Sequence, residues 1–148
     1  MSKIRVGVLM GGNSPEHEIS LVTGQAVIRE IDGERYETVP LVLGRDTTPA
    51  QIERLLHQAV ATPPGIDVVF IAMHGHPGED GTVQAICEEV GVPYTGSGVE
   101  ASRIGMDKVA TKERLTRAGL FVPISYEVTE TLWHTCAEEV LERIRCYL

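Results

Sequence analysis

The chain has 148 residues, of which 43% are hydrophobic, and a formal net charge of -8 at pH 7. This length suits one ordinary domain, or a small domain joined to part of a second one. The negative charge repels nucleic acid and acidic membranes, and no apolar segment approaches the roughly 20 residues that a membrane-spanning helix requires, so we expect neither a nucleic-acid nor a membrane partner.

The three cysteines, Cys87, Cys136 and Cys146, do not have the spacing of a metal site. If Cys136 and Cys146 share one helix, they lie about 15 Å apart, which is too far for a disulfide. The chain does not open with the basic and apolar pattern of a signal peptide. We therefore expect three free thiols and a cytoplasmic location.

Three short apolar segments, residues 4–10, 36–43 and 67–73, predict strands, and the first and the third are expected to be buried on both faces, as in a parallel sheet covered by helices. Pro40 lies within the second segment and cannot donate a backbone hydrogen bond. It therefore predicts an edge position or an irregularity for that strand.

The segments between these strands predict helices. In the first, Ser14 is the expected cap and Pro15 the first helical residue, and the helix is expected to end near Ile31. Thr48 and Pro49 mark the start of a second helix, and a third is expected over residues 82–90. Strands and helices alternate, which predicts a small doubly wound α/β unit over about the first 95 residues.

Residues 94–98 have the composition of a hinge, which predicts a domain over residues 1–96 and a second one over 97–148. In the second part we expect a short helix near Glu100, a helix from Asp107 to Ala118, and a strand over residues 124–128. A last amphipathic helix is indicated by an apolar stripe at helical spacing, Trp133, Ala137, Val140, Leu141, Ile144 and Leu148. This pattern reaches the final residue without a cap, which suggests a domain that has been cut short.

Two glycines and two acids follow the first strand in the segment MGGNSPEHEIS, residues 10–20. Ligands of open α/β sheets bind at this end of the strands, and glycine lets backbone approach them. The spacing fits neither common nucleotide-binding fingerprint, and Glu16 and Glu18 would repel a phosphate. An amino group is the better match, although Glu16 could instead complement only the helix dipole.

A second polar loop, HGHPGEDG, follows the third strand at residues 74–81. One interpretation of this loop, which the pattern supports only weakly, is a metal site with the ligands His74, His76, Glu79 and Asp80. The loop could instead be a surface turn, or it could belong to a functional site at the ends of the strands. Farther on, Lys108 and Lys112 lie one helical turn apart. They form either a solvated helix face or a local phosphate site.

Four segments together resemble the D-alanine–D-alanine ligases, the ATP-grasp enzymes of bacterial peptidoglycan synthesis. They follow the order of that family at plausible spacing: VLMGGNSPEHEISLVTG (8–24), HGHPGEDGTVQ (74–84), PYTGSGVEASRIGMDK (93–108) and TKERLTRAGLFVP (111–123). Ala85 and Gly105 depart from the usual family residues, and we expect little effect from either.

The resemblance implies an α/β fold: a small doubly wound, Rossmann-like parallel sheet of the pre-ATP-grasp kind, then an incomplete α+β ATP-grasp segment. It implies a ligase that uses ATP to phosphorylate one D-alanine, whose acyl phosphate is attacked by the amine of a second. Glu16 is expected as the catalytic and substrate-binding acid that holds the ammonium of the first D-alanine. His74, Gly12 and Gly78 are expected to line the same pocket, and Lys108 to approach the ATP phosphates.

The resemblance also implies limits for this chain. No metal ligand is expected within it, because the residues that hold Mg²⁺ belong to later parts of the family. The chain alone is therefore expected to be inactive, and a homodimer through the N-terminal domain is expected. Two other readings stay open, a stand-alone binding or interaction module without catalysis and the front of another ATP-grasp enzyme such as a biotin-dependent carboxylase.

Overall fold

The computed structural model describes residues 2–146. They form two compact units, with the boundary between Asp107 and Lys108, and each unit is described by itself. The helix α4 (Val99–Met106) thus groups with the first unit. The expected start of a second domain at residue 97 remains a prediction.

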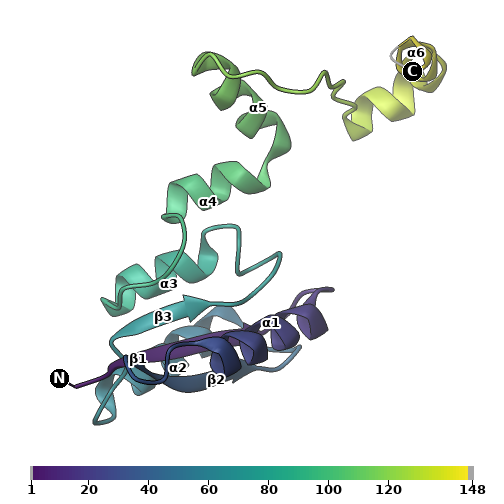
Figure 1. The fold of residues 1–148 in the computed structure, drawn as a ribbon. Helices are drawn as coiled ribbons and strands as arrows, with labels where there is room; N and C mark the ends of the chain where they lie inside the picture. The colour runs from purple at the N-terminus through teal and green to yellow at the C-terminus, as the bar shows by residue number, and fades with distance from the viewer. Residues whose placement is uncertain (1, 147–148) are drawn as a thin grey trace. The chain divides into compact units, whose positions relative to one another are not determined.

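Three parallel strands form the sheet of the first unit, in the order β2-β1-β3 (Figure 1). They are β1 (Ile4–Gly11), β2 (Tyr36–Leu43) and β3 (Val68–Ile71). Strand β2 lies at the edge, so the position predicted from Pro40 is confirmed. All three strands run the same way, and the loops that follow them therefore meet at one end of the sheet.

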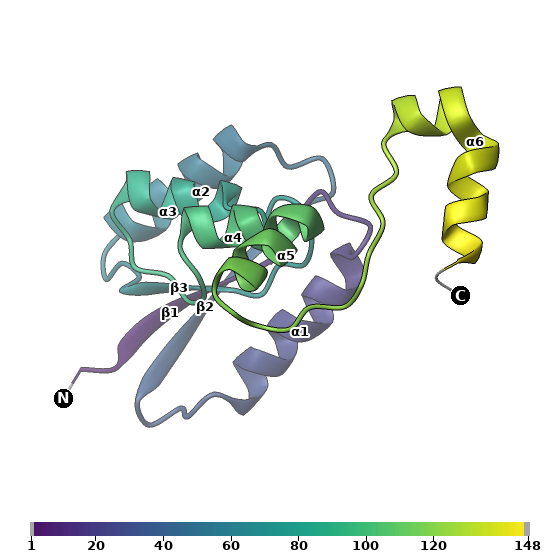
Figure 2. The same ribbon diagram turned by 90° about the horizontal axis from the view of Figure 1, so that it is seen from above.

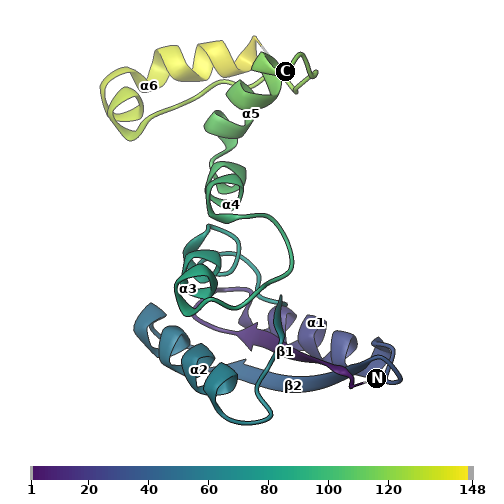
Figure 3. The same ribbon diagram turned by 90° about the vertical axis from the view of Figure 1, so that its left-hand side faces the viewer.

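Helices cover both faces of this sheet (Figures 2 and 3). On one face, α1 (His17–Glu30) packs on the alternate β1 residues Val6, Val8 and Met10. On the other face, α2 (Pro49–Ala61) and α3 (Thr82–Val90) enclose a second cluster that includes Leu9. The central strand is buried on both faces, and the predicted doubly wound α/β class is confirmed.

The start of α1 differs from the prediction. The helix begins at His17 with Glu16 as its N-cap residue, so Ser14 is not the cap and Pro15 lies before the helix. The reason is that Ser14 stabilises a turn before the helix. Its carbonyl oxygen accepts a hydrogen bond from the His17 backbone nitrogen at 3.1 Å, and its side-chain hydroxyl accepts one from the Glu16 backbone nitrogen at 3.1 Å. The start of α2 is as predicted, with Thr48 as the N-cap and Pro49 as the first residue.

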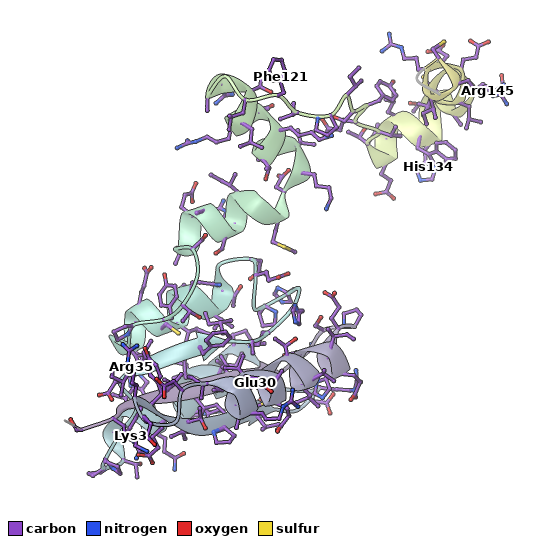
Figure 4. All side chains as sticks on the ribbon, viewed as in Figure 1. Lys3, Glu30, Arg35, Phe121, His134 and Arg145 are labelled. Carbon is purple, nitrogen blue, oxygen red and sulfur yellow. The ribbon has the colours of Figure 1, made fainter. Side chains whose placement is uncertain are left out.

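The second unit contains two helices within its described part, α5 (Lys108–Arg117) and α6 (Glu130–Arg145). The predicted strand at residues 124–128 is wrong, because this segment is irregular. A strand needs a neighbour for its backbone hydrogen bonds, and in the described part of the unit no other segment is extended beside it. Phe121, between the two helices, is exposed (Figure 4).

The predicted apolar stripe on α6 is only partly buried. Val140 is 1% exposed, whereas Trp133 and Leu141 are 44% and 41% exposed. A break at Cys136, where φ is -141° and ψ is 39°, interrupts the helix within the stripe. Leu148 lies outside the described residues. No helix among residues 2–146 is long and apolar enough to cross a membrane.

Candidate functional site

One face of α1 meets the loop that follows β3. Glu16, Ser20 and Thr23 have the spacing i, i+4 and i+7, which places them along one side of a helix. All three side chains approach residues 72–75. The candidate site is therefore built from the start of α1 and the chain leaving β3.

Ser20 connects the start of α1 to the ends of β1 and β3. Its buried hydroxyl accepts a hydrogen bond from the Gly11 backbone nitrogen at 2.8 Å and donates one to the Ala72 carbonyl oxygen at 2.8 Å. One side chain thus satisfies backbone groups at the ends of β1 and β3. Both strand ends are held against the same turn of α1.

The two glycines after β1 are needed for the shape of the turn. Gly11 and Gly12 have φ angles of 87° and 94°, in the region that only glycine enters without strain. A Cβ on Gly12 would lie 2.5 Å from Cε of Met73, and Nδ1 of the buried His17 lies 2.8 Å from the Gly12 carbonyl oxygen. The Gly12 backbone is therefore held close to the end of β3.

The Glu16 carboxylate lies over the second loop. Its Oε2 atom and the Ser14 hydroxyl oxygen are each 3.1 Å from the position that a Cβ would occupy on Gly75. Gly75 has a φ of 65°, so its backbone also favours glycine. Glu16 is an exposed residue at the N-cap of α1, and its carboxylate is thus accessible to a ligand at this loop.

His74 lies beside Gly75 and contacts the same helix. Its Nε2 atom is 2.9 Å from the Thr23 hydroxyl oxygen, a hydrogen bond between residues 51 positions apart. The ring is half-buried. The structure therefore brings together His74 and Glu16, which the sequence had singled out separately.

Internal hydrogen bonds hold the rest of the loop. The Glu79 carboxylate accepts from the Gly75 backbone at 2.8 Å, and the Gln84 side-chain nitrogen donates to the Gly78 carbonyl oxygen at 2.7 Å. A Cβ on Gly78 would collide with Met73. Met73 thus contacts both Gly12 and Gly78, and these two predicted site residues lie around one buried side chain.

Asp80 closes the loop onto α3. Its carboxylate accepts from Nδ1 of His76 and, at 3.0 Å, from the Thr82 backbone nitrogen. Partial burial acts to raise the pKa of Asp80, but the hydrogen bonds from His76 and Thr82 and the charge of His76 lower that pKa below its ordinary value. These acids and His76 serve the loop's own geometry, and no group of three or more His, Cys, Asp or Glu residues in the described part of the chain could hold a metal ion.

Lys108 belongs to the second unit, as the first residue of α5, and the structure does not place it relative to Glu16. It lines a cavity of about 840 Å³ together with Lys112 and Arg117. Glu113 and Glu127 also line this cavity, and Glu113 pairs with Arg117 at 3.1 Å. Lys108, Lys112 and Arg117 therefore face a common space within their own unit.

Sequence reasoning missed Ser20, Thr23 and Met73. Ser20 and Thr23 could have been found from their helical spacing to Glu16. Met73 carries no comparable signal, because a methionine at the end of an apolar segment is ordinarily only a core residue.

Known proteins resemble this chain over most of its length. The model of the family described as "D-ala D-ala ligase N-terminus" matches residues 5–59 and 44–97. The D-alanine–D-alanine ligase of Desulforudis audaxviator is 49% identical over 119 residues, which cover 80% of this chain and 36% of the relative. The ligase of Geobacillus thermodenitrificans is 37% identical over an alignment of 172 residues, which covers 96% of this chain and 47% of the relative.

A solved structure agrees with these relatives. The crystal structure of the Bacillus anthracis D-alanine–D-alanine ligase complexed with ATP matches with a TM-score of 0.74 and 37% identity, over 88% of this chain and 40% of the other. The chain thus spans between a third and a half of the length of these proteins. The family match, the relatives and the shared fold agree, and the chain belongs to the D-alanine–D-alanine ligase family.

Proposed function

We propose that this chain is the N-terminal part of a D-alanine–D-alanine ligase and that it binds the first D-alanine. The observation that carries the proposal is the exposed Glu16 carboxylate beside Gly75 and His74, at the end of the sheet where α/β proteins bind ligands. In the complete reaction ATP phosphorylates the carboxylate of this D-alanine. The amine of a second D-alanine then displaces the phosphate and forms the dipeptide.

Glu16 supplies the charge that this substrate requires. A carboxylate and an ammonium form a charge-assisted hydrogen bond, which is about twice as strong as a neutral one. In the proposal, Glu16 holds the ammonium of the first D-alanine and His74 lies beside the same substrate. The backbone of Gly12 and Gly78, each packed against Met73, forms the wall of the pocket.

The second unit is proposed to contribute to ATP binding. Lys108 and Lys112 line one cavity, and two ammonium groups fit the polyanionic phosphates of a nucleotide. ATP supplies the phosphoryl group, and the role of Lys108 is to neutralise charge on the phosphates. We place the Mg²⁺ ligands in the portion of the relatives that this chain does not span. We also propose a cytoplasmic location for the protein. A homodimer that forms through the N-terminal unit is proposed as well.

The test is a D-alanine titration of the 148-residue chain followed by NMR, comparing the wild type with Glu16→Gln. The variant keeps the size of the side chain but removes the charge that the ammonium requires. We expect the affinity for D-alanine to fall about tenfold or more, because hydrogen bonds to charged groups contribute about 1.5–3 kcal/mol.

Glu18→Gln is the matched control. Glu18 lies on the same turn, but its exposed carboxylate pairs with Arg45 at 2.7 Å. This variant is expected to bind D-alanine as the wild type does. Equal affinities of the wild type and Glu16→Gln would contradict the proposal, as would equal binding of L-alanine.

A further inference from the structure

Within residues 2–146, side chains of α1 make two hydrogen bonds with the chain leaving β3, and the one between Thr23 and His74 is the second. One helical turn earlier, Ser20 donates to the Ala72 carbonyl oxygen at 2.8 Å. The Thr23 hydroxyl oxygen then lies 2.9 Å from Nε2 of His74, two residues farther along that chain. Ser20 and Thr23, which lie one turn apart on the same face of α1, thus contact Ala72 and His74.

The residues around Thr23 on α1 pack tightly against the sheet. Ser20 is fully buried, and Gly24, the residue after Thr23, packs against Met10 of the central strand. A Cβ on Gly24 would lie only 2.5 Å from the sulfur of Met10, so the helix cannot move closer to the sheet. The Thr23 hydroxyl is therefore presented to His74 from a fixed position.

This contact decides how the imidazole can be used. A histidine ring has two nitrogens. A hydrogen bond to one of them orients the ring and sets which of the two nitrogens carries the proton. Nε2 is engaged by Thr23, and no other hydrogen bond to His74 is formed within residues 2–146. The remaining nitrogen, Nδ1, is the one left for a ligand.

We propose that Thr23 is a positioning residue, whose hydroxyl holds His74 by Nε2 and so assigns Nδ1 to the substrate that Glu16 binds. The proposal rests on the proposed function for the identity of that substrate. Thr23 itself does not touch the substrate, and its effect acts through the ring. Without the hydroxyl, the ring can rotate about its Cβ–Cγ bond, because no second hydrogen bond in the described part of the chain holds either nitrogen in place.

The experiment compares Thr23→Val with Thr23→Ser in the full 148-residue chain. Valine keeps the shape of threonine without its hydroxyl, whereas serine keeps the hydroxyl. The measurement is the pair of imidazole ¹⁵N resonances of His74 at about pH 9, above the ordinary pKa of histidine, assigned with His74→Gln. Thr38→Val is the matched control, because it makes the same change on β2 opposite Val6, near the other end of the sheet.

We expect both His74 nitrogen resonances to move in Thr23→Val and to stay at their wild-type positions in Thr23→Ser and Thr38→Val. The D-alanine affinity of Thr23→Val is expected to fall about two- to tenfold, as for the loss of one hydrogen bond. If valine disturbs the packing of α1, seen in the methyl resonances of Val8, Thr23→Ala is the second variant without a hydroxyl.

Unchanged His74 resonances in a folded variant without the hydroxyl would overturn the proposal. Equal changes in Thr23→Ser and Thr23→Val would also overturn it. The nitrogen resonances are recorded without ligand, so they decide the role of Thr23 even if the wild-type chain does not bind D-alanine. A wild-type chain that does not bind D-alanine would instead contradict the proposed function.

Discussion

The hydroxyl of Ser20 donates a hydrogen bond of 2.8 Å to the carbonyl oxygen of Ala72, and through this fully buried contact α1 is tied to the end of β3. The Ser20 hydroxyl oxygen also accepts a hydrogen bond from the Gly11 backbone nitrogen at 2.8 Å. Two strand ends and one helix therefore depend on a single side chain. It lies directly beneath the loops that carry Glu16 and His74.

Replacing Ser20 by alanine is expected to lower the free energy of unfolding by about 2–6 kcal/mol. The substitution leaves a buried N–H and a buried C=O without their partner, and each such group costs about 1–3 kcal/mol. Urea denaturation measures the change. Ser102→Ala is the control, because that hydroxyl makes a more exposed bond of 3.2 Å to the Ser97 carbonyl, and a loss below about 0.5 kcal/mol is expected there. Equal losses in the two variants would contradict the role given to Ser20.

Gly24→Ala tests the close packing of α1 on the central strand. A Cβ at this position would lie 2.5 Å from the sulfur and 2.8 Å from Cβ of Met10. Overpacking of this kind destabilises a fold by about 1–3 kcal/mol, although alanine is the better helix former. A lower midpoint of thermal unfolding is therefore expected.

Gly33→Ala is the matched control for this substitution. A Cβ on Gly33 meets no atom within 4 Å. The same chemical change is expected to be neutral or slightly stabilising there, by up to about 1 kcal/mol. If Gly24→Ala were as stable as Gly33→Ala, α1 would have room to move away from Met10.

The layered α/β unit could be predicted from the sequence because each of its strands carries a local pattern. A parallel strand buried on both faces appears as an unbroken apolar segment, as in β1 (Ile4–Gly11). Strand β2 has the predicted bounds, Tyr36–Leu43. Pro40 predicted an edge position or an irregularity for β2, and this strand does lie at an edge of the sheet. The start of α1 was misplaced because the Ser14 hydroxyl stabilises a turn before the helix, and both uses of serine have the same local signature.

The side-chain contacts of the candidate site could not be predicted in the same way. Glu16 and His74 were found because each stands in a recognisable segment, but Thr23 contacts His74 across 51 residues. That pairing depends on the register of α1 against β3, which Ser20 and Gly24 set. The predicted strand at 124–128 failed for a related reason, since strand formation depends on a neighbour rather than on local composition.

The three cysteines are expected to react at different rates with a thiol reagent. Cys87 is buried in the core between the sheet and α3, and burial followed by the nearby charge of Glu88 raises its pKa to about 11. At pH 8 only about one thiol in a thousand is then ionised, and the thiolate is the reactive form. Cys146 is exposed and Cys136 is half-buried.

We therefore expect Cys146 to react fast and Cys87 to react only when the first unit unfolds, as measured with a chromogenic disulfide reagent. Cys146→Ser removes the fast phase and identifies it. Cys87→Ser should leave the fast phase unchanged and remove the phase that appears on adding urea. Fast labelling of Cys87 in the native chain would contradict the packing of α3 on the sheet.

Asp80 is expected to make stability depend on pH in the acid range. Its pKa in the folded chain is below the ordinary value of 3.8: partial burial opposes this shift, but the hydrogen bonds from His76 and Thr82 outweigh it. A carboxyl group whose pKa is lower in the folded chain stabilises the fold at every pH above its unfolded pKa. This contribution is lost as the pH falls through the folded pKa, where the carboxylate becomes protonated in both states.

Asp80→Asn removes the titrating group, so we expect its free energy of unfolding to differ most from that of the wild type near pH 7. The difference should shrink as the pH falls below 3.8, which urea denaturation at a series of pH values measures. His76→Gln is expected to reduce the pH-dependent part without abolishing it, because the hydrogen bonds from Thr82 to Asp80 remain. A constant difference between wild type and Asp80→Asn from pH 7 to about pH 2 would contradict the prediction, because it would mean that the folded chain does not favour the ionised carboxylate.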